Sequence, residues 1–158
     1  MAIIIESPNE VYSLENNENK KLFLAGGITD CPDWQSEIIN DLKHIKDLTI
    51  YNPRRKDFPI DDPNASEEQI TWEYNHLRDS DIIIYWFSRG SINPIVLYEL
   101  GKWGTASDKP IFIGIDKDYT RSIDVEIQTK LSNPNAPIVY SLIELAIEVK
   151  NYITINEK

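Results

Sequence analysis

The chain is poor in cysteine and in positive charge. Cys31 is the one cysteine among 158 residues, which excludes a disulfide within the chain. Lys and Arg number 16 and Asp and Glu number 26, so the formal net charge is −10. Such a surface repels polyanions, and we therefore expect neither a nucleic acid polymer nor a membrane surface as a partner.

Long apolar runs and targeting signals are also missing. No run is long enough to span a bilayer, and the first residues lack the basic, apolar and small-residue order of a signal peptide. We therefore expect a cytoplasmic protein. The two histidines, His44 and His76, form no known metal pattern with Asp, Glu or Cys, so we expect no metal and no cofactor.

Apolar and aromatic residues are plentiful. Hydrophobic residues make up 41% of the chain and include 4 Trp, 8 Tyr and 4 Phe, enough for the core of one domain. Strand-like runs alternate along the chain with helix-like segments. Strands are predicted over residues 22–25, 48–51, 81–87, 110–115 and 138–140. Helices are predicted over residues 33–43, 66–78, 94–106, 121–131 and 141–152.

This alternation predicts a doubly wound α/β fold of the flavodoxin or Rossmann type. We expect a single five-stranded parallel sheet of strand order 2-1-3-4-5, with helices on both faces. Residues 1–21 are expected to form an N-terminal strand or arm with a polar loop, ahead of one domain over 22–158. In such a sheet the ligand crevice lies beyond the carboxyl ends of the strands.

Two carboxylates stand out near that crevice. Glu99 lies in the apolar helical stretch "SINPIVLYELG", where Asn93 and Pro94 favour a helix start. Glu73 lies in the preceding helix, and an exposed glutamate on an amphipathic helix is the alternative interpretation for it. If both converge on the crevice, they can act as nucleophile and general acid, as in retaining glycoside chemistry.

Loops with ligand-binding potential follow the first two strands. Gly26 and Gly27 would let backbone N–H groups approach a ligand closely, although a tight turn explains them equally well. Arg54 and Arg55 suit phosphate or carboxylate recognition, and a solvated pair facing surface acids is the alternative.

A third loop follows the strand over 81–87. Ser88 and Ser91 supply hydroxyl groups there, next to the N-terminus of the helix that begins at Pro94. Together with that helix end they predict an anion or sugar-hydroxyl site.

Four stretches, in this order and spacing, resemble the nucleoside 2-deoxyribosyltransferase family, and in particular its nucleoside 2-deoxyribosyltransferase-like branch. They are "LFLAGGI", "NPRR", "QITWEYNHLRDSDIIIYWF" and "INPIVLYELGKWG". The related deoxynucleoside 5′-monophosphate N-glycosidases share the same frame. The resemblance extends from about Leu22 to the C-terminal helix.

The resemblance implies a role for each carboxylate. Glu99 matches the family's nucleophile, which forms a covalent glycosyl-enzyme. Glu73 matches the acidic residue that assists protonation of the departing base, where the relatives carry Asp. Asn93 stands where transferases have an Asp that holds the 5′-hydroxyl and where the hydrolases have a Ser near the phosphate. Gly27 replaces a Ser that is common in the family.

The implied activity is cleavage of 2′-deoxynucleosides with transfer of the deoxyribosyl group to another base. The alternatives are a hydrolase that cleaves the N-glycosidic bond of 2′-deoxynucleoside 5′-monophosphates, and a non-catalytic nucleotide sensor in which Glu99 bonds a ribose hydroxyl. Nucleosides, nucleotides and nucleobases are the implied partners, and a homodimer or larger assembly is expected because the relatives complete their sites with a neighbouring subunit. The candidate substrate-binding residues are Gly26, Gly27, Asn52, Arg54, Arg55, Trp72, Ser88, Ser91 and Asn93.

Overall fold

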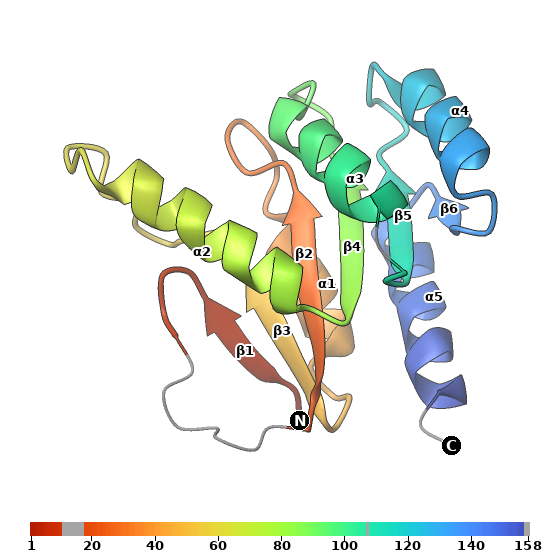
Figure 1. Ribbon diagram of the computed structural model, residues 1–158, viewed down its shortest axis with the longest axis horizontal. Helices are drawn as coiled ribbons and strands as arrows, with labels where there is room; N and C mark the ends of the chain where they lie inside the picture. The colour runs from red at the N-terminus through yellow and green to blue at the C-terminus, as the bar shows by residue number, and fades with distance from the viewer. Residues whose placement is uncertain (11–17, 107, 157–158) are drawn as a thin grey trace.

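Six parallel strands form one sheet in the computed structural model, which describes residues 1–10, 18–106 and 108–156 (Figure 1). The strands are β1 (Ile3–Glu6), β2 (Lys20–Gly26), β3 (Leu48–Asn52), β4 (Ile82–Phe87), β5 (Ile111–Ile115) and β6 (Ile138–Val139). The helices are α1 (Trp34–Leu42), α2 (Ala65–Asp79), α3 (Pro94–Ala106), α4 (Ser122–Ser132) and α5 (Leu142–Ile155).

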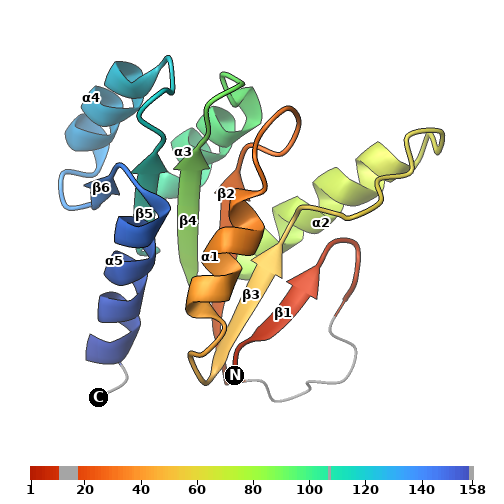
Figure 2. The same cartoon turned by 180° about the vertical axis from the view of Figure 1, so that it is seen from behind.

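The helices cover both faces of the sheet, which confirms the doubly wound class. Helices α2, α3 and α4 lie on the face seen in Figure 1, whereas α1 and α5 lie on the face seen in Figure 2. In β4, alternate residues pack into the two layers: Ile83, Tyr85 and Phe87 join the core under α2 and α3. Because both faces of this strand are buried, its sequence is continuously apolar.

The sheet order is β1-β3-β2-β4-β5-β6. The five predicted strands have the predicted order, but the predicted number of strands is wrong, because β1 adds a sixth at the edge. Its residues pair in parallel with β3, from Ile3 opposite Thr49 to Glu6 opposite Asn52. An edge strand of four residues depends on the partner strand more than on its own pattern, so the local sequence gave only a weak signal. Residues 11–17, where the predicted polar loop begins, lie outside the described residues.

The chain reverses direction across the sheet at β2. From β2 it passes through α1 to β3 on one side, and from β3 it returns through α2 to β4 on the other side. This is the switch point at which doubly wound sheets bind ligands. The loops that follow β2 and β4 meet there, beyond the carboxyl ends of the strands. None of the helices, within the residues that the structure describes, is long and apolar enough to cross a membrane.

Candidate active site

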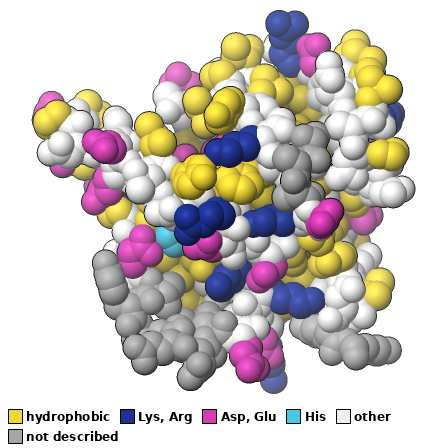
Figure 3. Space-filling view, viewed as in Figure 1, with side chains coloured by type: hydrophobic (Ala, Val, Ile, Leu, Met, Phe, Trp, Pro, Cys, Tyr) yellow, Lys and Arg dark blue, Asp and Glu magenta, His cyan; other side chains and the backbone are white. Residues whose placement is uncertain are grey.

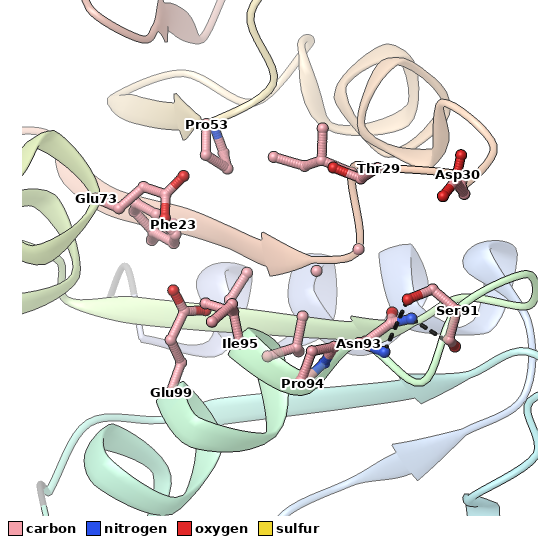
Figure 4. Close-up of a pocket in the computed structure, with 15 residues that line it drawn as sticks. Phe23, Thr29, Asp30, Pro53, Glu73, Ser91, Asn93, Pro94, Ile95 and Glu99 are labelled. Carbon is pink, nitrogen blue, oxygen red and sulfur yellow. Dashed lines mark hydrogen bonds between the residues drawn. The ribbon is translucent and has the colours of Figure 1, made fainter. Parts of the chain in front are cut away.

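A cavity of about 360 Å³ lies at this switch point (Figure 4). Its walls come from β2 and the loop after it, from α2, and from the loop and first turns of α3. The lining residues are Phe23, Ala25, Gly26, Gly27, Ile28, Thr29, Asp30, Pro53, Glu73, Ser91, Asn93, Pro94, Ile95, Val96 and Glu99.

Glu73 and Glu99 both line this cavity, one from α2 and one from α3. Figure 4 shows the two side chains at the same end of the cavity, with their carboxyl groups directed into it. Glu99 is 9% exposed, and no described residue donates a hydrogen bond to its carboxylate. Glu73 accepts one from Gln69, whose Nε2 lies 2.7 Å from Oε1 of Glu73. The structure therefore brings together the two predicted catalytic residues.

Burial changes the acidity of both groups. Burial raises the pKa of Glu99 to about 8, and the nearby charge of Glu73 adds to the shift. Burial also raises the pKa of Glu73, against a lowering effect of the hydrogen bond from Gln69. Two carboxyl groups that share a poorly solvated cavity titrate as a pair. The pair therefore favours retaining one proton at neutral pH, with one member ionised and the other neutral.

Gln69 was not singled out from the sequence, yet it holds Glu73 in place. Its Nε2 also donates to the carbonyl of Pro53 at 2.8 Å, and its Oε1 accepts from Oγ of Ser7 at 2.7 Å. Gln69 lies four residues before Glu73 on α2, so the two side chains share one face of the helix. This four-residue spacing is the feature of the sequence from which the contact between Gln69 and Glu73 could have been predicted.

Asn93 builds the loop that precedes α3. Its Nδ2 donates to the carbonyls of Ser88 at 3.3 Å and Ser91 at 2.7 Å, while its Oδ1 accepts from the backbone N–H of Ser88 at 3.0 Å. Its φ of 51° lies in the left-handed region, which Asn tolerates better than most residues. Pro94 begins α3 as predicted. The buried amide of Asn93 therefore shapes the cavity wall through contacts within the loop.

The two predicted glycines permit close packing at the cavity wall. A Cβ at Gly26 would lie 2.3 Å from the Trp34 ring, and a Cβ at Gly27 would lie 2.5 Å from Oδ1 of Asn93 and 2.5 Å from Sγ of Cys31. Neither position has room for a side chain. The space that a serine would need at position 27 is filled by Asn93 and Cys31.

The arginine pair does not line the cavity. The guanidinium of Arg54 donates to the carbonyls of Ile28, Cys31 and Pro32 and to Oε1 of Gln35, and it lies 3.4 Å from the Asp33 carboxylate. It thus ties together the loop after β2.

Arg55 is bound on the outer side of the same region. It forms an ion pair with Glu68 at 3.0 Å and lies over the Phe58 ring at 5.5 Å. Both positive charges are committed to contacts within the chain.

Three further candidates also lie outside the cavity lining. Asn52 is buried and accepts a hydrogen bond from the backbone of Arg54 at 3.1 Å. Trp72 lies in the core, stacked on His76 at 4.0 Å between ring centroids. Ser88 is buried, and its Oγ has no hydrogen-bond partner among the described residues.

Asp30 lines the cavity although the sequence did not single it out. Figure 4 shows it at the end of the cavity away from Glu73 and Glu99, on the side of Ser91. Its φ of 58° is left-handed, and its carbonyl faces Gly90, where a Cβ would lie 2.6 Å from that oxygen. Within the described part of the chain, no group of three or more His, Cys, Asp or Glu side chains could hold a metal ion.

Comparisons with known proteins identify the family and support the fold. Residues 19–119, more than half of the chain, match the family model described as nucleoside 2-deoxyribosyltransferase like. No curated protein matches the chain. A crystal structure of a conserved protein from Enterococcus faecalis V583 is similar, with a TM-score of 0.61 and 16% sequence identity over 85% of this chain and 99% of that chain. At that identity the similarity shows the fold alone.

Proposed function

Because the chain belongs to the nucleoside 2-deoxyribosyltransferase-like family, we propose that it cleaves the N-glycosidic bond of 2′-deoxynucleosides and transfers the deoxyribosyl group to another base. The observation that carries this proposal is the pair of carboxyl groups, Glu73 and Glu99, directed into one cavity at the switch point of the sheet. Family membership suggests glycosyl transfer or hydrolysis, and the pair supplies the two groups that such chemistry requires.

In the first step, the ionised carboxylate of Glu99 attacks the anomeric carbon of the sugar. A C–O bond to Glu99 forms while the C–N bond to the base breaks, and the bonding electron pair leaves with the base nitrogen. Glu73 gives its proton to the departing base. In the second step the nitrogen of an acceptor base attacks the same carbon, expels Glu99 and returns a proton to Glu73.

This division of work requires one proton shared by the two carboxyl groups. A nucleophile must be ionised and an acid must be protonated in the same complex, which a coupled carboxyl pair with one proton allows. Because the pKa of Glu99 is raised to about 8, the free protein holds this proton on Glu99, and the proton passes to Glu73 before Glu99 attacks. No described residue donates a hydrogen bond to the Glu99 carboxylate, so its lone pairs are free to react. The hydrogen bond from Gln69 holds Glu73 at a fixed position beside it.

Product analysis tests the proposal directly. The protein is incubated with each deoxynucleoside, with and without an acceptor base, and products are separated by chromatography. A new deoxynucleoside in the presence of acceptor supports transfer, whereas free deoxyribose as the sole sugar product would assign a hydrolase. Intact mass after a slow substrate should show a deoxyribosyl adduct that is lost in Glu99→Gln and retained in Glu67→Gln, an exposed control on α2. Tight nucleotide binding without adduct or product would favour the sensor.

We also propose that the protein assembles as a homodimer or larger oligomer. Support comes from exposed apolar side chains on α3 beside the cavity, where Ile95 is 62% exposed and Tyr98 is 69% exposed. Light scattering coupled to size-exclusion chromatography measures the assembly, and a monomer at micromolar concentration would contradict it.

A further inference from the structure

The cavity carries negative charge without a balancing cation. Asp30, Glu73 and Glu99 line it, and no Lys, Arg or His does so among the described residues. Arg54 and Arg55 are bound within the chain, as described above. Arg89 lines a separate cavity of about 330 Å³ near the N-termini of α1 and α5.

Basic side chains on the α2 and α3 face are engaged as well. Figure 3 shows Lys and Arg side chains gathered over the middle of this face. Lys102 on α3 lies over the Tyr74 ring of α2 at 4.3 Å, and Lys109 donates to the carbonyl of Leu77 at 2.8 Å. No basic side chain among the described residues is therefore placed to bind an anionic group of a ligand inside the cavity.

Asp30 is presented to the cavity by its backbone. Its left-handed φ and the close approach of Gly90 fix the position of its Cα. Its side chain is exposed, and no described residue donates a hydrogen bond to its carboxylate or forms an ion pair with it. Its oxygens are consequently available to a ligand.

This inference rests on the proposed function, because the proposed roles of Glu99 and Glu73 define how the substrate is oriented in the cavity. If the anomeric carbon lies at Glu99 and the base lies near Glu73, the remaining length of the cavity leads toward Ser91 and Asp30. The group of a nucleoside that lies farthest from the glycosidic bond on the sugar is its 5′ substituent. That substituent therefore faces Asp30.

We propose that the site takes nucleosides with a free 5′-hydroxyl and that Asp30 is the specificity-determining residue that rejects a 5′-phosphate. A carboxylate accepts a hydrogen bond from a hydroxyl but repels a phosphate dianion. The N-terminus of α3 attracts an anion with about half an elementary charge, and Pro94 supplies no N–H there. The full negative charge of the Asp30 carboxylate exceeds that half charge, so the repulsion of a phosphate dominates.

The test compares kcat/KM for the deoxynucleosides and for their 5′-monophosphates. For the unmodified protein we expect a preference for the free nucleosides of at least about 100-fold, because juxtaposed like charges cost several kcal/mol. Asp30→Asn should reduce this preference about tenfold or more, and Asn suits the position because it tolerates a left-handed backbone. The control Asp61→Asn removes an equal charge from an exposed loop residue outside the cavity and should leave the preference unchanged.

A preference for the monophosphates, or an equal preference in the parent and in Asp30→Asn, would overturn the inference. Binding measured calorimetrically on Glu99→Gln, which holds a ligand without forming an adduct, gives the same ratio independently of turnover. Absence of any product with preferential binding of free nucleosides would defeat the proposed function but support the role of Asp30. Product formation with tighter binding of monophosphates would do the reverse.

Discussion

The buried carboxyl group of Glu99 should make the stability of the protein depend on pH. The pKa of Glu99 is raised from 4.5 to about 8 in the folded chain, chiefly by burial. Between these two values the folded chain retains a proton that the unfolded chain has released. The free energy of unfolding must therefore fall as pH rises through this window, and the stability gained from the neutral form is fully present only below pH 4.5.

The magnitude follows from the shift. Each pH unit in the window corresponds to about 1.4 kcal/mol, so the whole shift is worth on the order of 5 kcal/mol. Glu99→Gln replaces the titrating group by a neutral one of similar shape. We expect the free energy of unfolding of Glu99→Gln, minus that of the parent, to grow by about 3 kcal/mol from pH 5.5 to pH 8.5. This corresponds to roughly 10 °C in Tm at the higher pH.

Urea unfolding followed by tryptophan fluorescence measures this difference, since the chain contains 4 Trp. The pH range should stay above the pI of about 4.6, where a protein is least soluble. Titrating groups other than Glu73, which is coupled to Glu99, cancel in the difference between variant and parent. Glu67→Gln serves as the matched control, because Glu67 is exposed on α2, and its difference from the parent should be constant within about 0.5 kcal/mol.

A difference between Glu99→Gln and the parent that stays constant from pH 5.5 to pH 8.5 would refute the reasoning. So would a variant that loses stability relative to the parent as pH rises. Either result would mean that Glu99 is ionised in the folded chain at little cost, and that water or a cation reaches it.

Three further predictions concern the frame of the site. Gly27→Ala should lower the free energy of unfolding by about 1–3 kcal/mol because its Cβ meets Asn93 and Cys31, and part of this loss should return in the double variant with Cys31→Ala, as measured by thermal melts. Asn93→Ala should cost about 2–4 kcal/mol through lost hydrogen bonds and a strained left-handed φ, whereas Asn93→Gly should cost less; equal losses would contradict the strain argument. Gln69→Leu should raise the pKa of Glu73, and an activity profile that does not move toward higher pH would argue against Glu73 as the acid.

The sequence predicted the layers of the fold because both faces of the sheet are covered. The run over 82–87 had to be apolar at every position, and that pattern distinguishes a central strand from an exposed one. The sequence predicted a strand or arm near the N-terminus but not that β1 joins the sheet, because its pairing with β3 connects residues far apart in the chain. Glu99 was visible as a charge within an apolar helix, and its convergence with Glu73 on one cavity follows from the parallel topology.

The direction of the polar side chains could not be predicted in the same way. Arginine commonly binds phosphate, but the guanidinium of Arg54 donates to backbone carbonyls, and no local sequence pattern reveals these contacts. Asn93 lines the cavity, and its amide also closes its own loop through hydrogen bonds that no local pattern reveals. Asp30 reached the cavity through a left-handed backbone conformation, which a single sequence does not specify for a non-glycine residue.

The hydrogen bonds of Arg54 and Asn93 have a consequence for the thermodynamics of binding. Both cavity loops are fixed by contacts made within the folded chain, so their conformational entropy is lost during folding and not when a ligand arrives. A ligand then meets a preorganised wall, and its affinity is not diminished by loop ordering. Calorimetric binding should accordingly show the small heat-capacity change of a modest buried area, without the larger change that accompanies the ordering of a segment.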